Sequence, residues 1–453
     1  MQTIQHKPIM MNTISHTKWI CAVIALLFSI GLKAQEADNI FSVDLYTVTR
    51  GELRKGGIYS DSTDSKHMAN FVIGKYRLDF DYKRSSWLEL RLSPQQTAVW
   101  GQTTGGFSLF EGWALFQSQN GLFAKVGRQL LSYDDGRILG YDDWAMTDPS
   151  YDVLKMGYEG RNHKFHVILS YNQNPTVNEN ATSYYTDGLQ PNKMMQTLWY
   201  HFDTPMTFGA SLLFMNIGME SVDPLYPNKV FFQQLLGTYM SFNPKHWFLK
   251  AGFYYQMGKE AGGLPLDAFL SFGKVTYTPN DNFSLFGGYD YLSGVKLYDY
   301  MSHTMSGSEQ GYICSGFNPM YGSHHDFYSA LDFFYMDSFE GNFTPGLQNL
   351  YAGVTVNPIR PLELDLTYHY FAIASDLDYV PSKKLGHEID FEADYTFSDI
   401  VKLSAGYTFL LGSKTMDIVQ QKLDENHKMH WGWLMLTINP KSFTTSWRDK
   451  NKH

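Results

Sequence analysis

Many segments of the chain alternate between apolar and polar residues with a period of two. In LELDLTYHY, residues 362–370, every second residue is a leucine or tyrosine, and the residues between them are two carboxylates, a threonine and a histidine. GKYRLDFDY (74–82) and HEIDFEADY (387–395) repeat the pattern with charged residues as the polar members. This period is typical of a β-strand with one apolar and one polar face. Segments of about ten residues are long enough for tilted strands to cross an outer membrane.

The connections between these segments alternate in length. Short connections with Pro, Asn or Asp fall at 243–246, 278–281, 357–361 and 397–399. Longer, polar and Gly-rich connections fall near 258–266, 294–324, 338–346, 374–385 and 412–428. Short turns at one rim and long loops at the other are typical of bacterial outer-membrane barrels, whose short turns face the periplasm.

We therefore predict an all-β fold, a single transmembrane antiparallel β-barrel formed by residues 35–453. The pattern indicates about 18 strands, because bacterial barrels have an even number of strands. Strands and loops use nearly all of this length, so no separate plug domain is expected. A soluble β-sandwich or propeller is the alternative, but those folds have shorter strands and do not separate short turns from long ones.

Composition agrees with a sheet that is apolar on one face and wet on the other. Aromatic residues make up 16% of the chain, yet its mean hydropathy is only −0.30. This combination suits a barrel whose aromatic outer face contacts lipid while its inner face contacts water. We therefore expect the protein in the outer membrane of the cell.

Residues 1–34 have the features of a secretory signal peptide. Lys18 precedes the apolar run WICAVIALLFSIGL (19–32), which is short for a membrane span and is closed by Ala34. We expect cleavage after Ala34; an uncleaved membrane anchor is the alternative. Of the two cysteines, only Cys314 would remain, which excludes a disulfide or a Cys-based metal site within one mature chain.

Alternation predicts two groups of charges that point into the lumen. Six belong to the first third of the chain: Lys164 and the five that form what we call the basic arc, Lys75, Arg77, Arg91, Lys125 and Lys155. Six belong to two later strands and form the acidic arc: Glu363, Asp365, Glu388, Asp390, Glu392 and Asp394. Two arcs of opposite sign would orient a polar solute and favour anions along the basic side. Alternatively, the charges pair across strands and only keep the interior wet, or the carboxylates bind Ca²⁺.

Residues 124–160 interrupt the alternation. A strand with Arg128 and Gln129 leads into a loop rich in aspartate, and a strand with Lys155 follows. The aspartate spacing does not match an EF-hand, so we predict no metal site and no cofactor. Strict alternation points Arg128 away from Lys125, so a lumen position for Arg128 requires a β-bulge.

Four stretches resemble the alginate-export family of outer-membrane barrels, in the form found in Bacteroidetes-type sequences. They are VGRQLLSYDDGRILG with the following DW (126–144), GSHHDFYSALDFFY (322–335), NLYAGVTVNPIRPLELDLTYHYF (349–371) and KLGHEIDFEADYTFSDIVKLSAGYTFLL (384–411).

The resemblance implies a monomeric barrel with a basic constriction, through which an anionic polysaccharide leaves the periplasm by passive diffusion. It places Arg128 and Arg137 at this constriction, where a guanidinium can bind a uronate carboxylate through two hydrogen bonds. The expected partners are the outer-membrane bilayer with its lipopolysaccharide and small polar or anionic saccharides. The net charge of −9 disfavours nucleic acid, and the acidic arc departs from the electropositive pore that alginate export requires. We therefore predict a passive channel of the alginate-export type rather than a dedicated alginate exporter.

Other functions remain as alternatives. A general diffusion porin without a defined substrate is the nearest. A barrel enzyme would need Ser323, His324, His325 and Asp326, but consecutive strand residues alternate between faces and cannot assemble a nucleophile, a base and an orienting group. We therefore predict no enzymatic activity. An adhesin would use the loop 294–324, which could equally fold inward as a lid on the pore.

Overall fold

The computed structural model describes residues 39–55, 68–103, 105–141, 144–146, 150–172, 193–205, 207–221, 229–295, 313–323, 325–332, 334, 344–419 and 428–448. The predicted signal peptide lies outside the described residues. Among these residues, no helix is both long and apolar enough to cross a membrane.

The described residues form β-strands connected by turns and loops, with one short helix, α3 (Lys414–Val419). The strands are β1 (Asn39–Lys55), β2 (Ala69–Arg84), β3 (Leu88–Val99), β4 (Gly106–Gln117), β5 (Leu122–Gln129), β6 (Tyr151–Glu159), β7 (His163–Tyr171), β8 (Met194–Asp203), β9 (Phe208–Glu220), β10 (Val230–Phe242), β11 (Trp247–Lys259), β12 (Pro265–Asn280), β13 (Phe283–Leu292), β14 (Leu347–Ile359), β15 (Leu362–Ala372), β16 (Lys384–Thr396), β17 (Val401–Gly412), β18 (Lys428–Ile438) and β19 (Lys441–Trp447).

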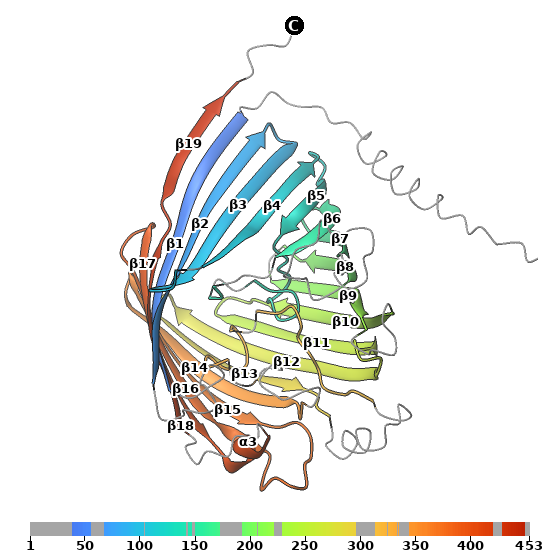
Figure 1. Cartoon of the computed structure of the whole chain (residues 1–453), viewed down its shortest axis with the longest axis vertical. Helices are drawn as coiled ribbons and strands as arrows, with labels where there is room; N and C mark the ends of the chain where they lie inside the picture. The colour runs from blue at the N-terminus through green and yellow to red at the C-terminus, as the bar shows by residue number, and fades with distance from the viewer. Residues whose placement is uncertain are drawn as a thin grey trace, which may run out of the picture.

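The strands form one closed antiparallel barrel (Figure 1). Each strand pairs with its neighbours in the sequence, and the ring closes where β1 meets the end of the chain. Residues 47–55 of β1 pair with β18, and residues 39–44 pair with β19. Because β18 and β19 follow one another along β1, they fill one position in the ring, and the barrel has 18 strand positions. The predicted fold and strand number are confirmed.

Side chains separate by face as the alternation predicted. On β15, Leu366 and Tyr368 are 47% and 43% exposed, whereas Phe371, of the opposite parity, is fully buried. On β2, Tyr76 and Leu78 point outward while Lys75 is fully buried inside. The outer surface therefore carries many large apolar side chains. A closed barrel with such a surface is an outer-membrane protein, because its backbone hydrogen bonds are all made between strands and its exterior suits lipid.

Connections differ in length at the two rims. Short turns join β10 to β11, β12 to β13, β14 to β15 and β16 to β17, as expected. One expectation was wrong: the sequence indicated separate loops at 294–324 and 338–346. The structure has a single connection from β13 to β14, and its described residues 325–332 form no strand.

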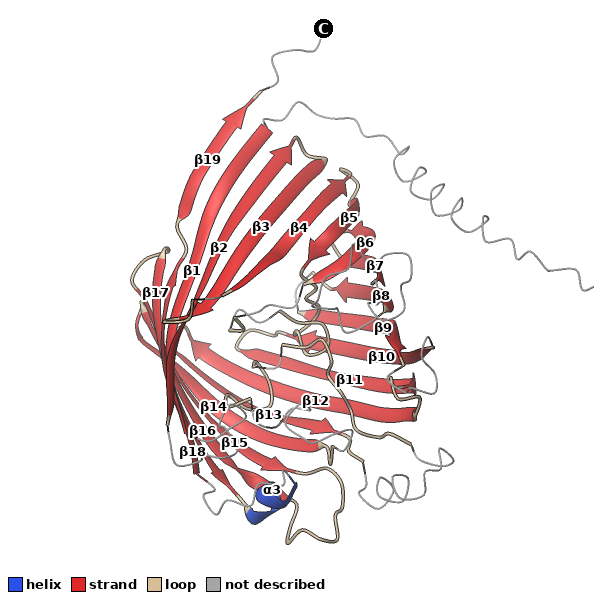
Figure 2. Ribbon diagram, in the orientation of Figure 1, coloured by secondary structure: helices blue, strands red, loops and turns tan. Residues whose placement is uncertain are grey.

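Two segments between strands lie inside the barrel. We call residues 130–141 and 144–146, between β5 and β6, the first inner segment. Residues 313–323, 325–332 and 334, between β13 and β14, are the second inner segment. Leu139 and Tyr321 form a parallel bridge between them, and Gly140 N donates to Tyr321 O at 2.8 Å. Figure 2 shows loops crossing the interior of the ring of strands.

Glycine is required where the two inner segments touch. A Cβ atom at Gly140 would lie 2.1 Å from Gly136 O and 2.4 Å from the backbone nitrogen of Ser323. Ser323 N itself donates to Gly136 O at 2.9 Å. The inner segments and the inward faces of the strands share the main hydrophobic core, which includes Leu131, Leu139, Phe317 and Tyr328. The lumen is thus narrowed by packed protein, not by side chains of the wall alone.

Candidate functional site: the lumen and its inner segments

Arg137 fastens the first inner segment to the barrel wall. Its guanidinium lies 3.0 Å from an Asp290 carboxylate oxygen on β13 and 3.6 Å from Asp135. The guanidinium carbon stacks 3.9 Å above the Phe272 ring and 4.1 Å from the Phe327 ring. A cation held between two aromatic faces and two carboxylates is well compensated for the loss of its water shell.

The sequence-based role of Arg137 therefore needs correction. Its side chain is only 1% exposed, so a solute passing through the lumen does not contact it. Arg137 also donates to Tyr328 OH at 3.3 Å, which links the two inner segments. The residue holds the constriction together instead of lining it.

The aspartates of the first inner segment are used by protein contacts. Asp135 accepts from Lys250 on β11 at 3.0 Å. Asp134 accepts from Trp199 Nε1 at 3.2 Å and from Ser211 Oγ at 2.5 Å. Burial raises the pKa of Asp134 above its ordinary value, and these two hydrogen bonds oppose that shift. No group of three or more His, Cys, Asp or Glu residues in the described part of the chain is arranged to hold a metal ion.

The other end of the first inner segment rests on strands β1 to β3. Arg50 donates to Trp144 O at 2.8 Å, and its guanidinium stacks 3.6 Å over the Trp144 ring. Lys75 Nζ donates to Ala145 O at 2.9 Å. Lys75 of the basic arc therefore faces inward as predicted, but it is covered by this segment.

The second inner segment is attached to the acidic wall. Glu388 on β16 is fully buried and accepts hydrogen bonds from Ser329 Oγ and Ala330 N, each at 2.9 Å. A carboxylate with both oxygens bonded to one loop is a strong local anchor. This acid of the predicted arc is thus an attachment point and is not open to the lumen.

The residues of the enzyme alternative do not form a catalytic set. Ser323 Oγ donates to Asp326 at 2.6 Å, whereas His325 Nδ1 lies 3.1 Å from Asp332. His325 also stacks on Trp144 at a centroid distance of 4.4 Å. Ser323 and His325 thus each contact a different aspartate; His324 lies outside the described residues.

Four residues of the basic arc keep some exposure on the wall formed by β2 to β6. Arg77 pairs with Asp79 at 3.3 Å, and Arg91 pairs with Asp81 at 2.7 Å and Glu111 at 3.2 Å. Arg91 is thus compensated by carboxylates on the two neighbouring strands, which is the pairing across strands given above as an alternative, whereas Arg77 pairs within its own strand.

Lys125 and Lys155 are less compensated. They lie directly opposite each other in the β5–β6 pairing. Lys125 Nζ is 3.9 Å from Glu111 and 3.8 Å from the Trp113 ring centroid. Lys155 Nζ lies 5.6 Å from the Phe123 ring and forms no ion pair with any described residue. Like charges opposite one another destabilise a sheet, so this pair is suited to an added anion.

Arg128 does not point into the lumen, which corrects the constriction role implied by the resemblance. The register pairs Arg128 with Asp152, and its guanidinium forms hydrogen bonds of 2.9 and 2.7 Å with that carboxylate. Both residues share the parity of Val126, which is exposed on the outer face, whereas Gln129 is fully buried inside. The β5–β6 pairing contains no bulge that would turn Arg128 inward. Strict alternation had placed Arg128 on the outer face, and the structure places it there.

The acidic arc faces inward on β15 and β16 as predicted. Glu363 lies opposite Asp394, and Asp365 lies opposite Glu392. Asp394 forms an ion pair of 2.7 Å with Lys402 and accepts from Ser404 Oγ.

The remaining carboxylates of the arc have different neighbours. Asp365 accepts from Thr355 Oγ1 at 2.5 Å, and Asp390 lies 3.4 Å from His369 Nε2. Glu392 is exposed and has no cationic partner among the described residues.

Lys125 and Lys155 of the basic arc lie on the wall opposite the acidic arc. Between β5–β6 and β15–β16 lie eight strands on one side of the ring, β7 to β14, and six on the other, β17, β18 and β1 to β4. Lysines on one wall and carboxylates on the other set up a field across the lumen.

Sequence reasoning missed a charged cluster on β1. Arg50 and Arg54 each donate to a different oxygen of Glu52 at 2.8 Å, and Trp431 Nε1 donates to Glu52 at 3.0 Å. The three charged residues alternate in RGELR (50–54), so the period-two pattern was sufficient to find them. Their contact with Trp431 depends on barrel closure, which no local pattern reveals.

Comparison with known proteins shows the fold. No family model matches the chain. No curated protein matches it either. Among solved structures, Pseudomonas aeruginosa OccD3 (OpdP) is similar with a TM-score of 0.58 and 12% identity, over 91% of this chain and 95% of that one. OccK11 (OpdR) of the same organism has a TM-score of 0.56 and 10% identity, over 89% and 96% of the two chains. OccK2 (OpdF), solved in complex with glucuronate, has a TM-score of 0.57 and 11% identity, over 89% and 98%. At these identities the likeness concerns the outer-membrane barrel fold alone.

Proposed function

We propose that the protein is a passive outer-membrane channel for polar or anionic sugars and oligosaccharides. The observation that carries this proposal is the Lys125–Lys155 pair, two lumen lysines opposite each other, of which Lys125 has an ion pair with Glu111 at 3.9 Å and Lys155 has none with a described residue. A uronate carboxylate would offset one of the two positive charges while accepting hydrogen bonds from both lysines, and Trp113 and Phe123 lie beside them to contact a sugar ring. The structural neighbour solved with glucuronate supports this class of solute.

The acidic arc on the opposite wall gives the solute an orientation. One of its two exposed members, Glu392, repels a carboxylate and accepts hydrogen bonds from sugar hydroxyls. A sugar acid would therefore travel with its carboxylate toward β5 and β6 and its hydroxyls toward β15 and β16. A uniformly charged polymer fits this lumen less well than a short oligosaccharide does.

The alginate-export resemblance stays a prediction, and we include alginate-type uronates in the proposed solute class on that basis. We also propose that the channel acts as a monomer. A general diffusion pore without substrate preference is the second candidate, favoured by the wall charges that pair among themselves. The adhesin alternative rests on the loop 294–324; its residues 296–312 lie outside the described residues, and its residues 313–323 lie inside the barrel.

Single-channel recording in planar bilayers tests the proposal. The mature protein should give ohmic steps that glucuronate blocks more strongly than glucose does. Lys125→Gln with Lys155→Gln should weaken the glucuronate block about tenfold, because each charge-assisted hydrogen bond contributes about 1.5–3 kcal/mol, part of which water replaces. The matched control is Lys245→Gln with Arg360→Gln, which removes two exposed positive charges in the short turns between β10 and β11 and between β14 and β15.

Three outcomes would contradict the proposal. Equal block by glucose and glucuronate would leave only general diffusion. An equal loss of block in the control variant would assign the effect to net charge. A silent bilayer, with hydrolysis of added lipids or esters, would replace the channel with an enzyme.

A further inference from the structure

The outer face of β15 to β18 carries two tyrosine–histidine pairs near the rim with the long connections. Tyr368 OH lies 2.6 Å from His387 Nδ1, and Tyr407 OH lies 2.7 Å from His430 Nδ1. Tyr368 and Tyr407 are 43% and 48% exposed, so both pairs face the surroundings of the barrel. The two pairs are equivalent in design, since each joins the two strands of one hairpin.

Each pair keeps one hydrogen-bond donor without a partner among the described residues. If the phenol donates to Nδ1, the imidazole proton lies on Nε2 and points away from the pair. If Nδ1–H donates to the phenol oxygen, the phenol proton is left over. In either tautomer an N–H or O–H remains on a face that borders lipid, where an unmet donor is costly. The site therefore calls for an acceptor-rich ligand.

Three lysines surround these pairs at the same rim. Lys55 lies opposite His430 in the β1–β18 pairing, and Lys428 is two residues before His430. Leu411 lies opposite both His387 and Lys428, which places those two residues two strands apart, about 10 Å. Lys384 begins β16, three residues before His387.

The positive charge of this patch is not balanced by ion pairs among the described residues. We name as the rim patch Lys55, Lys384, Lys428, His387 and His430 with the phenols of Tyr368 and Tyr407. None of its lysines forms an ion pair with a described residue. Two other cations near this rim are paired: Arg128 with Asp152 at 2.7 Å and Lys193 with Glu220 at 3.3 Å.

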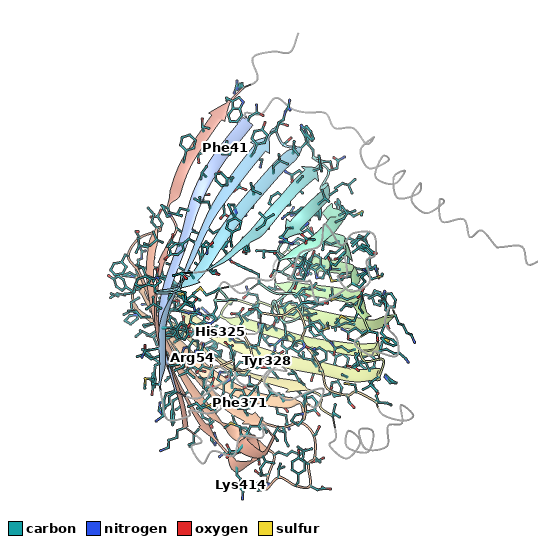
Figure 3. All side chains as sticks on the ribbon, viewed as in Figure 1. Phe41, Arg54, His325, Tyr328, Phe371 and Lys414 are labelled. Carbon is teal, nitrogen blue, oxygen red and sulfur yellow. The ribbon has the colours of Figure 1, made fainter. Side chains whose placement is uncertain are left out.

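The position of the patch fixes the kind of ligand. The long connections after β1, β15 and β17 lie at the rim that faces outside the cell in barrels of this class. Farther along the same outer face, Ile389, Phe391 and Leu434 are exposed apolar residues. A lipid with a phosphorylated headgroup beside the lysines and acyl chains along these apolar residues would match both the charged and the apolar part of this surface. Figure 3 shows Lys414 of α3 at this end of the molecule, which adds a further exposed cation.

We propose that the rim patch binds the phosphate groups of lipopolysaccharide in the outer leaflet. A phosphate supplies the negative charge that the three lysines lack and accepts hydrogen bonds from the two tyrosine–histidine pairs. The acyl chains of the same lipid then cover the apolar strand faces beside the patch. This site is independent of the lumen and of the solute that crosses it.

Binding of lipid A to the purified, full-length mature protein tests the proposal. The probes are phosphorylated lipid A and the same lipid after enzymatic dephosphorylation, titrated in detergent and counted by native mass spectrometry. The triple variant Lys55→Gln, Lys384→Gln, Lys428→Gln should bind phosphorylated lipid A about 100-fold more weakly, since each lysine near an anionic surface contributes about 1 kcal/mol. The matched control Lys83→Gln, Lys245→Gln, Arg360→Gln removes three charges at the opposite rim and should bind as the wild type does.

A second variant separates hydrogen bonding from charge. His387→Phe with His430→Phe keeps both rings and should weaken binding about tenfold; heat-modifiable gel mobility verifies that each variant is folded. Equal affinity for phosphorylated and dephosphorylated lipid A would overturn the proposal. So would an equal loss in the control variant, or a patch variant that changes the oligomeric state while lipid binding is unaltered, which would assign the patch to a second copy of the chain.

Discussion

Replacing Arg137 with methionine should release the inner segments from the wall. Methionine keeps much of the side-chain length but removes the cation between Phe272 and Phe327. Asp290, only 3% exposed, would then keep a single hydrogen bond, from Asn349 Nδ2 at 3.0 Å. Breaking a buried ion pair by removing one partner costs about 3–5 kcal/mol. A cost of about 4 kcal/mol shifts the balance between docked and released segments by roughly a thousandfold.

The barrel itself should survive this change. Its strands are joined by backbone hydrogen bonds that do not involve Arg137, so the loss applies to segment docking and not to the ring. Conductance of the Arg137→Met channel should therefore rise and become noisier in planar bilayers. Chymotrypsin should also cleave within the inner segments, which carry Tyr133, Phe327 and Tyr328.

A double variant measures the ion pair directly. Arg137→Met with Asp290→Asn leaves no uncompensated charge, and it should restore most of the wild-type conductance. Arg128→Met is the matched control, because its partner Asp152 is exposed and such surface pairs contribute about 0–1 kcal/mol. The reasoning is refuted if Arg137→Met behaves as wild type in both assays, or if the double variant is as open as the single one.

Two further predictions concern the acidic wall and the remaining thiol. Glu392→Gln with Asp365→Asn should shift the ion selectivity toward anions, measured as a change of reversal potential under a salt gradient, because it neutralises two opposed lumen carboxylates; an unchanged potential would mean that this wall does not control the pore. Cys314 should not react with maleimide at pH 8 in the folded protein, because burial raises the pKa of its thiol to about 11. After denaturation the same thiol should react. Labelling of Cys314 in the native channel would instead show that the second inner segment opens.

Local periodicity was enough to predict the wall of the barrel. Each strand residue faces inward or outward according to parity, and parity follows from the sequence alone wherever no bulge intervenes. This holds for Glu363 and Asp365, and it also holds for Arg128, where alternation was right and the family resemblance misleading. The even strand number followed from the same pattern and from the need to close the ring.

The interior could not be predicted in the same way. The stretch HDFYSALDFFY (325–335) is rich in aromatic residues and looks like a strand, but its described residues pack inside the barrel against strands remote in the sequence. Arg137 carries no local sign of its burial, because its partner Asp290 is more than 150 positions away. Contacts between segments distant in the sequence decide which charged side chains are buried and which contact water. A period of two describes only residues that are close in the sequence.

The seam between the first and last strands has a consequence for assembly. Trp431 donates to Glu52 across 379 positions of sequence, and joining ends that far apart costs about 5 kcal/mol in chain entropy. The edge of β1 that pairs with β18 and β19 therefore stays unpaired until these strands reach it. During that time the edge can pair with an exposed strand of another chain. A chain truncated before β18 would keep this edge permanently and should aggregate. Pairing of β18 and β19 with β1 closes the ring and removes the exposed edge at which the chain could aggregate.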